Sequence, residues 1–274
     1  MTSVTEQHIR LAGRDIAFRQ SAGTGRPVVF VHGNSCSSRA WLPVLTGAFG
    51  ERFRSLAFDL PGHGGSARAE DPEDYCVPGY ASVLADFLRE TGAQDAVIVG
   101  WSLGGHIVLE AAPALPEAAG FAVLGTPPIS GPADMGEAFV SNPALGVGFA
   151  AQVDAEAARS LAGNFLAPGS TAPTDGFVED ILATDGMARE VLFASLGGGR
   201  FADEIAIVTG LKQPLAVLHG EGERFISLDY LRTLSIPTLW RGAVQVLPGV
   251  GHAAQFEDPE QFAEVLTAFI EDLG

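Results

Sequence analysis

The sequence predicts an α/β protein built on a mostly parallel, doubly wound sheet. Two observations support this prediction: short apolar runs alternate with stretches of helical spacing, and several of these runs end abruptly at small or polar residues. Continuous apolar runs are typical of strands that are covered on both faces. Repeated strand–helix units place functional residues at the carboxyl ends of the strands, so a site is expected along that edge of the sheet.

The predicted strands have apolar residues either at every position or at every second one. Residues 14–20 alternate apolar and polar, which predicts a half-buried strand. Further strand-like runs lie at 28–31, 55–58, 96–99, 121–124, 215–218 and 244–247. Most of these runs are too short to be helices, so they fit the interior strands of the predicted sheet.

The predicted helices place their apolar residues on one face. They lie at 80–91, 106–115, 155–162, 175–183 and 259–273. In the last of them Phe262, Leu266 and Phe269 share one face, as in a helix that packs against a sheet.

Residues 127–210 differ from the rest of the chain. Pro127 and Pro128 interrupt the alternation of strands and helices, which resumes only after the end of this segment. The segment is rich in alanine, glycine and phenylalanine, and it shows helical spacing but no strand. We therefore predict a core domain made of residues 1–126 and 211–274, with residues 127–210 inserted as a helical cap.

Charge and apolar content argue against several classes of partner. The formal net charge is −17, so nucleic acid and anionic membranes would approach against electrostatic repulsion. No apolar run approaches the roughly 18 residues of a membrane span, and residues 1–10 lack the apolar region of a signal peptide. The two cysteines allow at most one disulfide. We expect a cytoplasmic protein that acts on a small molecule; its oligomeric state stays open.

A serine stands in a cramped turn directly after a predicted strand. The segment Gly100-Trp101-Ser102-Leu103-Gly104 follows the apolar run 96–99 and precedes a predicted helix. This order of strand, Gly-x-Ser-x-Gly and helix is the arrangement called a nucleophile elbow. Side chains at the two glycine positions would clash with neighbouring backbone, and the helix N-terminus favours developing negative charge. Ser102 is therefore the predicted nucleophile.

Two later strand ends supply the partners that a nucleophilic serine needs. A serine hydroxyl reacts when a base takes its proton, and the base needs a carboxylate to hold its tautomer. His252 follows the last predicted strand, and Glu221 and Glu223 follow the strand before it. In such a turn the carboxylate is expected three positions after Gly220, which favours Glu223 over Glu221. Ser102, Glu223 and His252 form the predicted catalytic triad.

Acyl transfer also needs N–H groups that stabilise the oxyanion. The expected donors are the backbone N–H of the residue after the nucleophile and one N–H from the loop that follows residues 28–31. In this chain they belong to Leu103 and Asn34. The sequence leaves open whether the Asn34 side chain binds a substrate carbonyl or stabilises the turn.

The remaining histidines near the predicted strand ends are expected to be structural. His32, His63, His106 and His219 lie in loops, at a strand end or in the helix after Ser102, and none is expected to transfer a proton. Cys36 lies near the expected site, but no basic group is aimed at it, so packing is its expected role. No spacing of His, Cys or carboxylate residues suits a metal, and no Gly-x-Gly-x-x-Gly crossover indicates a nucleotide. Neither a metal nor a cofactor is expected.

Four motifs together resemble the serine hydrolases of the α/β-hydrolase fold. They are His32-Gly33-Asn34-Ser35, Asp59-Leu60-Pro61-Gly62-His63-Gly64-Gly65-Ser66, Gly100-Trp101-Ser102-Leu103-Gly104-Gly105-His106 and Gly251-His252. The resemblance covers almost the whole chain outside the cap, and it implies that the cap is inserted after the sixth strand. Serine at position 102 argues against the haloalkane dehalogenase and epoxide hydrolase branches, which have aspartate there.

A narrower resemblance indicates one group of these enzymes. The segment from Gly100 to Ile107, followed by Gly125-Thr126-Pro127-Pro128 and a glutamate as the acid, is similar to the cytoplasmic, metal-independent N-acyl-homoserine lactonases of this fold. The similarity implies the triad and the oxyanion donors named above, and a quorum-quenching enzyme that opens a lactone through an acyl-enzyme. The cap contains no tyrosine, so it offers no phenol to a substrate.

Other functions are compatible with the same residues. One is a general carboxylesterase, and another is a hydrolase of carbon–carbon bonds or a perhydrolase. A third is a sensor that binds a small molecule with little or no turnover. Rates on a lactone, an aryl ester and a peracid assay separate the enzymes, whereas a sensor shows a ligand-induced melting shift without turnover.

Overall fold

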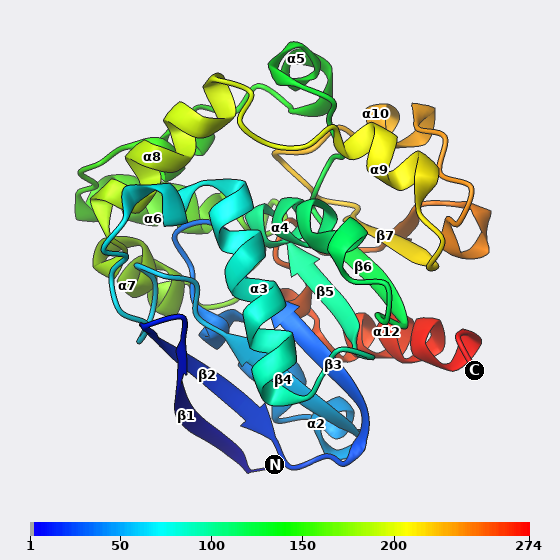
Figure 1. Cartoon of the computed structure of the whole chain (residues 1–274). Helices are drawn as coiled ribbons and strands as arrows, with labels where there is room; N and C mark the ends of the chain where they lie inside the picture. The colour runs from blue at the N-terminus through cyan, green and yellow to red at the C-terminus, as the bar shows by residue number, and fades with distance from the viewer. Residues whose placement is uncertain (1–2) are drawn as a thin grey trace.

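An eight-stranded sheet runs through the centre of the computed structural model, which describes residues 3–274 (Figure 1). The strands are β1 (Val4–Leu11), β2 (Arg14–Ser21), β3 (Gly25–Val31), β4 (Phe53–Phe58), β5 (Val97–Trp101), β6 (Gly120–Leu124), β7 (Leu215–Gly220) and β8 (Gln245–Leu247). Their order across the sheet is β1-β2-β4-β3-β5-β6-β7-β8. β2 pairs antiparallel with β1 and β4, and the other neighbours pair parallel. The predicted mostly parallel sheet is confirmed.

The central strands owe their position to side chains that cannot remain in water. In β3 the residues Val28, Val29, Phe30 and Val31 are all fully buried. The next two strands across the sheet, β5 and β6, are buried along their whole length. Strands of this kind need cover on both faces, which only the interior of a sheet layered with helices provides.

β1 is the strand that the sequence pattern does not predict. Its residues Thr5 to His8 are exposed, and the strand is antiparallel to β2 at the edge of the sheet. An edge strand that faces solvent lacks the apolar alternation by which a strand is recognised in a sequence.

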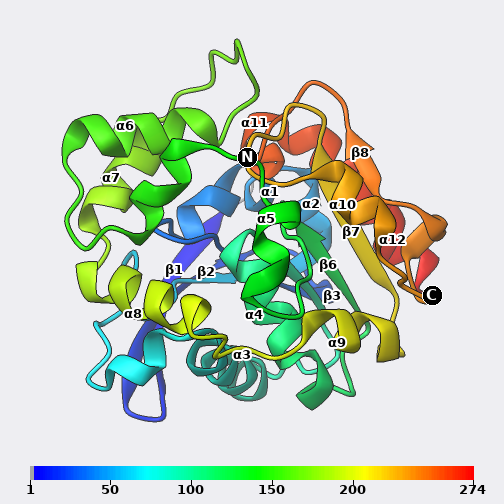
Figure 2. The ribbon, with the colours of Figure 1, turned by 90° about the horizontal axis from the view of Figure 1, so that it is seen from above.

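Helices cover both faces of the sheet (Figure 1). Their bounds are α1 (Leu42–Leu45), α2 (Ala48–Arg52), α3 (Val77–Thr91), α4 (Leu103–Ala111), α5 (Met135–Ala138), α6 (Ala155–Asn164), α7 (Asp175–Ala183), α8 (Gly186–Gly197), α9 (Glu204–Gly210), α10 (Leu228–Thr233), α11 (Ala254–Glu257) and α12 (Pro259–Asp272). α3 and α4 pack together on one face, while α1, α2, α11 and α12 lie on the other (Figure 2). This is the doubly wound arrangement that the sequence predicts. No helix within residues 3–274 is long and apolar enough to cross a membrane.

The helix after Ser102 differs from the expectation in both bounds. The pattern predicts residues 106–115, whereas α4 starts at Leu103 and ends at Ala111. The prediction starts too late because the first turn of α4 contains glycines, which weaken the helical pattern of a sequence. The helix ends before Pro113, which lies in a 3₁₀ helix (Ala112–Ala114), because proline cannot continue the α-helical hydrogen bonding.

The segment between β6 and β7, residues 125–214, contains α5 to α9 and no strand, and all of its residues are described. Its predicted helices at 155–162 and 175–183 are present as α6 and α7, while the sequence pattern does not predict α8. In Figures 1 and 2, α6, α7 and α8 gather on the side of β1 and β2, and α9 lies toward β6. Buried residues of this segment join the same hydrophobic cluster as the sheet. The division into a core and a cap of residues 127–210 stays a proposal.

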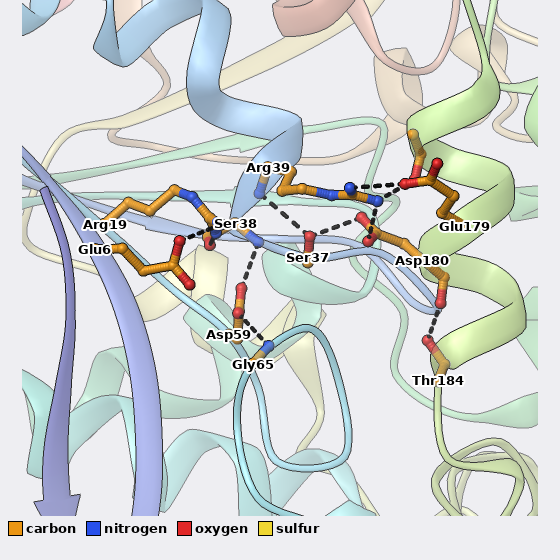
Figure 3. A network of polar contacts seen from close by, with 11 residues as sticks. Glu6, Arg19, Ser37, Ser38, Arg39, Asp59, Gly65, Glu179, Asp180 and Thr184 are labelled. Atoms are coloured by element: carbon orange, nitrogen blue, oxygen red, sulfur yellow. Dashed lines mark hydrogen bonds and ion pairs between the residues drawn. The ribbon is translucent and has the colours of Figure 1, made fainter. Parts of the chain in front are cut away.

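A polar network joins the loop after β3 to α7 of this segment (Figure 3). The Ser37 hydroxyl donates to the carboxylate of Asp180 (2.7 Å), and Arg39 pairs with both Asp180 (2.7 Å) and Glu179 (2.9 Å). Burial raises the pKa of Asp180, and the bonds from Ser37 and Arg39 oppose this rise. These contacts connect the loop after β3 to the segment between β6 and β7.

Candidate active site

Ser102 occupies a strained turn between β5 and α4. Its backbone has φ 55° and ψ −119°, a conformation that non-glycine residues rarely adopt. A Cβ at Gly100 would clash with the backbone of Gly104, and a Cβ at Gly104 would clash with the carbonyl of Val31. Both glycines of the Gly-x-Ser-x-Gly segment are therefore required for the close approach of β3, β5 and α4. The turn places Ser102 at the carboxyl end of the sheet, as predicted.

His252 and Glu223 form a short hydrogen bond beneath the surface. Nδ1 of His252 lies 2.7 Å from Oε2 of Glu223, and the two side chains are 3% and 1% exposed. Oε1 of Glu223 accepts hydrogen bonds from the backbone N–H groups of Arg224 (2.7 Å) and Phe225 (2.8 Å). Burial alone would raise the pKa of Glu223, but the charge and hydrogen bond of His252 and the Phe225 N–H hold it below its ordinary value. We therefore assign the proton of a neutral His252 to Nδ1, which leaves Nε2 available as a base.

The choice between the two glutamates of this turn is visible in their contacts. The exposed Glu221 accepts a hydrogen bond from the backbone N–H of Gly249 (3.0 Å), which ties together the loops after β7 and β8. Glu223 points to His252 instead. The geometry therefore favours Glu223, as the sequence does.

Aromatic rings enclose His252 on several sides. The ring centroids of Phe225, Trp101 and Phe165 lie 5.1, 5.6 and 5.9 Å from that of the imidazole. The indole N–H of Trp101 donates to the backbone carbonyl of His252 (2.8 Å). These contacts fix the orientation of the imidazole, and the sequence pattern does not predict them.

A cavity of about 80 Å³ lies over Ser102. Its wall includes four of the five predicted site residues, namely Ser102, His252, Asn34 and Leu103, while Glu223 lies behind His252. The remaining wall is formed by His106, Phe139, Leu145, Gly148, Phe149, Leu161, Phe165, Leu192, Leu196 and Phe225. Most of these residues come from the segment between β6 and β7, so this segment determines the shape of the cavity.

The two residues predicted to supply the oxyanion donors, Leu103 and Asn34, line the same cavity as Ser102. Leu103 is the first residue of α4, where backbone N–H groups have no acceptor within the helix. The sequence leaves open whether the Asn34 side chain binds a substrate or stabilises its turn. The structure shows a contact that neither role includes. The Asn34 amide donates a hydrogen bond to the carbonyl of Gly148 in the inserted segment (2.6 Å).

Three other histidines are buried and do not line the cavity. His32 contacts the Gly33 carbonyl through Nδ1 (2.8 Å), and its Nε2 accepts from the N–H of Leu60 (3.0 Å). Burial lowers the pKa of His32, of His63 (to about 3) and of His219, so all three rings are neutral near pH 7. Within residues 3–274 no cluster of His, Cys, Asp and Glu residues is arranged to hold a metal ion.

His106 is different, because it lines the cavity. The sequence prediction places it in the helix after Ser102 without a role in the site. The available signal is its position four residues after Ser102, in the first turn of the helix that begins directly after this serine. That signal alone does not separate a cavity residue from an ordinary core residue.

Comparison with known proteins places the chain in a family. Residues 28–265 match the model of the alpha/beta hydrolase family. The chain belongs to this family. The chain is also similar to the pimeloyl-[acyl-carrier protein] methyl ester esterase of Methylococcus capsulatus, at 31% identity over 77% of this chain and 82% of that protein.

Two solved structures resemble the whole chain. One is a mutant of the N-acyl homoserine lactonase AidH in complex with N-hexanoyl homoserine, at 33% identity and a TM-score of 0.94, covering 99% of this chain and 98% of that one. The other is AidH in complex with N-butanoyl homoserine, at 34% identity and a TM-score of 0.93, covering 98% and 97%. The similarity therefore includes the inserted helices as well as the sheet.

Proposed function

We propose that this alpha/beta hydrolase is an N-acyl-homoserine lactonase that opens the lactone ring through an acyl-enzyme on Ser102. The observation that carries the proposal is the match to AidH over nearly the full length of both chains, cap region included. The wall of the cavity over Ser102 is mostly apolar with a few polar side chains, a lining that suits an acyl chain and a small polar ring. We further propose a cytoplasmic location and a small-molecule substrate, with neither nucleic acid nor membrane as partner.

In the first step Ser102 attacks the lactone carbonyl. His252 Nε2 takes the hydroxyl proton while the Oγ–carbon bond forms, and Glu223 stabilises the resulting imidazolium. The backbone N–H groups of Leu103 and Asn34 stabilise the oxyanion. When the intermediate collapses, the ring carbon–oxygen bond breaks and the alkoxide takes the proton from His252. The alcohol remains attached to the acyl group, because both belonged to one ring.

In the second step water attacks the acyl-enzyme. His252 takes a proton from the water, the bond to Ser102 Oγ breaks, and the serine recovers its proton. The product is N-acyl-homoserine, a carboxylic acid that releases one proton at neutral pH. Apart from the substrate and one water molecule, both steps use only side chains and backbone of this chain.

A second candidate is a carboxylesterase. The methyl ester esterase named above is 31% identical over 77% of this chain, and the same nucleophile and base would cleave an open-chain ester. The two candidates differ in what the cavity binds, not in the chemistry at Ser102.

Proton release at constant pH with N-hexanoyl-homoserine lactone tests the proposal. We expect acid production that is lost in Ser102→Ala and unaffected by a metal chelator. Hydrolysis of p-nitrophenyl butyrate with no turnover of the lactone would show that the enzyme is an esterase. Ligand-induced stabilisation without turnover of either compound would show a sensor.

A further inference from the structure

A second histidine–glutamate pair faces the same cavity. Nδ1 of His106 lies 2.8 and 3.0 Å from the two carboxylate oxygens of Glu204, and the side chains are 13% and 1% exposed. Glu204 is the first residue of α9, and it also accepts a hydrogen bond from the backbone N–H of Ile129 (3.0 Å). The carboxylate is thus held from two sides, and it holds the imidazole of His106 in turn.

The place of His106 relative to Ser102 follows from the helix between them. Ser102 is the N-cap residue of α4, and His106 lies in the first turn of this helix, four residues later. Both side chains line the same cavity. Apart from Ser102, Asn34 and His252, it is the single polar side chain in the wall of this cavity, which is otherwise apolar. A polar atom of the substrate near the scissile carbonyl therefore has His106 as an available partner.

The contact with Glu204 determines what His106 presents to the cavity. A carboxylate accepts hydrogen bonds, so we assign the proton of the neutral ring to Nδ1. The described residues provide no partner for Nε2, and this atom is not among the buried atoms that lack one. Nε2 is therefore free to accept a hydrogen bond from a ligand in the cavity.

We propose that His106 is a specificity residue whose Nε2 accepts the amide N–H of an N-acyl-homoserine lactone, with Glu204 as its positioning residue. This inference rests on the proposed function. In that substrate the amide nitrogen is attached to the carbon next to the scissile carbonyl. The wall of the same cavity, four residues after the nucleophile, is a suitable place for its recognition, and the acceptor disfavours substrates that leave it unpaired.

The purely structural alternative makes a different prediction. If His106 only ties α4 to α9, then its Nδ1–H is the group that matters and Nε2 is dispensable. Asparagine and glutamine separate the two nitrogens. The amide of His106→Asn reaches the place of Nδ1 and retains the bond to Glu204, whereas the amide of His106→Gln reaches the place of Nε2.

The experiment compares two lactones that differ by one group. The first is N-hexanoyl-homoserine lactone, and the second is its carba analogue, in which CH₂ replaces the amide N–H. For each enzyme the ratio of the two kcat/KM values is measured, which cancels any loss of folded protein. We expect a wild-type ratio of about ten in favour of the amide, as for one hydrogen bond within a site. His106→Asn should lower the ratio to near one, and His106→Gln should keep most of it.

Several results would overturn the inference. The first is a wild-type enzyme that hydrolyses both lactones equally well. The second is a His106→Asn variant with the same kcat/KM ratio as the wild type. The third is a His106→Gln variant whose ratio is as low as that of the asparagine variant. His8→Asn is the matched control, because His8 forms a surface pair with Asp15 (3.3 Å) far from the cavity. It should leave the ratio unchanged.

The two proposals fail in different ways. If the wild-type enzyme opens neither lactone but cleaves p-nitrophenyl butyrate through Ser102, then the proposed function is wrong and this inference with it. If the wild-type enzyme opens the lactones and the variants show no selective effect, only the role of His106 is wrong.

Discussion

Trp101, the residue before the proposed nucleophile, donates its indole N–H to the backbone carbonyl of His252 (2.8 Å). The indole is fully buried and lies against the imidazole. One residue of β5 thus positions Ser102 through the chain and the loop of His252 through a hydrogen bond. We expect the distance between the proposed nucleophile and the proposed base to depend on this contact.

Trp101 does not line the cavity, but we expect its replacement by phenylalanine to lower activity because of this hydrogen bond. Trp101→Phe keeps a ring but leaves the His252 carbonyl without its donor, so we expect kcat to fall about tenfold and stability by about 1–2 kcal/mol. Trp240→Phe is the control, because Trp240 donates to Asp272 (2.9 Å) in α12, away from the cavity. The control should lose stability and keep kcat; equal kcat in both variants would contradict the prediction.

The two glutamates of the β7 turn should differ sharply in function. Glu223→Gln keeps the size of the side chain but removes the charge that stabilises the His252 imidazolium, so we expect kcat to fall by about three to four orders of magnitude. Glu221→Gln should keep kcat within about twofold, because its carboxylate bonds only to Gly249. Steady-state rates of both variants on N-hexanoyl-homoserine lactone provide the comparison. A large loss of kcat in Glu221→Gln with little loss in Glu223→Gln would make Glu221 the acid partner of His252.

His63 should make folding stability depend on pH. Burial lowers its pKa from 6.5 to about 3, so between these values the unfolded chain binds a proton that the folded protein does not. Stability contributed by the neutral ring is therefore present above about pH 6.5 and decreases as pH falls, by roughly 1.4 kcal/mol per pH unit. Urea unfolding of the wild type and His63→Gln from pH 4 to 8 measures it. The same pH slope in both proteins would contradict the prediction.

The network in Figure 3 should hold the inserted segment on the core through one buried carboxylate. Asp180→Ala leaves Ser37 and Arg39 without their buried acceptor, and we expect a loss of about 2–4 kcal/mol in the free energy of unfolding. Glu179→Ala removes the exposed partner of the same arginine and should cost less than about 1 kcal/mol. Chemical denaturation of the two variants provides the comparison; equal losses would assign the network no special role.

Much of the sheet is predictable because an unbroken apolar run in the sequence indicates a buried strand. Val28 to Val31 and Ala96 to Val99 are apolar at every position, and no other place in a protein of this size accommodates them. β1 is not predictable in this way, because its exposed residues Thr5 to His8 carry no burial signal. The same limit applies to α8, where the apolar and polar residues do not form a clear stripe.

The candidate site is only partly predictable, for a related reason. Ser102 is recognisable because its strand, turn and helix are contiguous in the chain. Glu223 and His252 are recognisable because each lies in the loop that follows a strand. The bond between Asn34 and Gly148 joins residues 114 positions apart, and that between His106 and Glu204 joins residues 98 positions apart. Nothing in the neighbourhood of one partner indicates the other.

By itself, the sequence determined the α/β class, the interior strands, the elbow at Ser102 and the strand ends that carry Glu223 and His252. These features depend on local patterns of apolar and small residues, whose burial preferences are the same in any fold. Only the tertiary structure decided the wall of the cavity, the pairing of His106 with Glu204 and the contact of Asn34 with the inserted segment. Those features depend on the path of the chain between β6 and β7, which is the sum of many weak packing interactions and is not encoded at any single position.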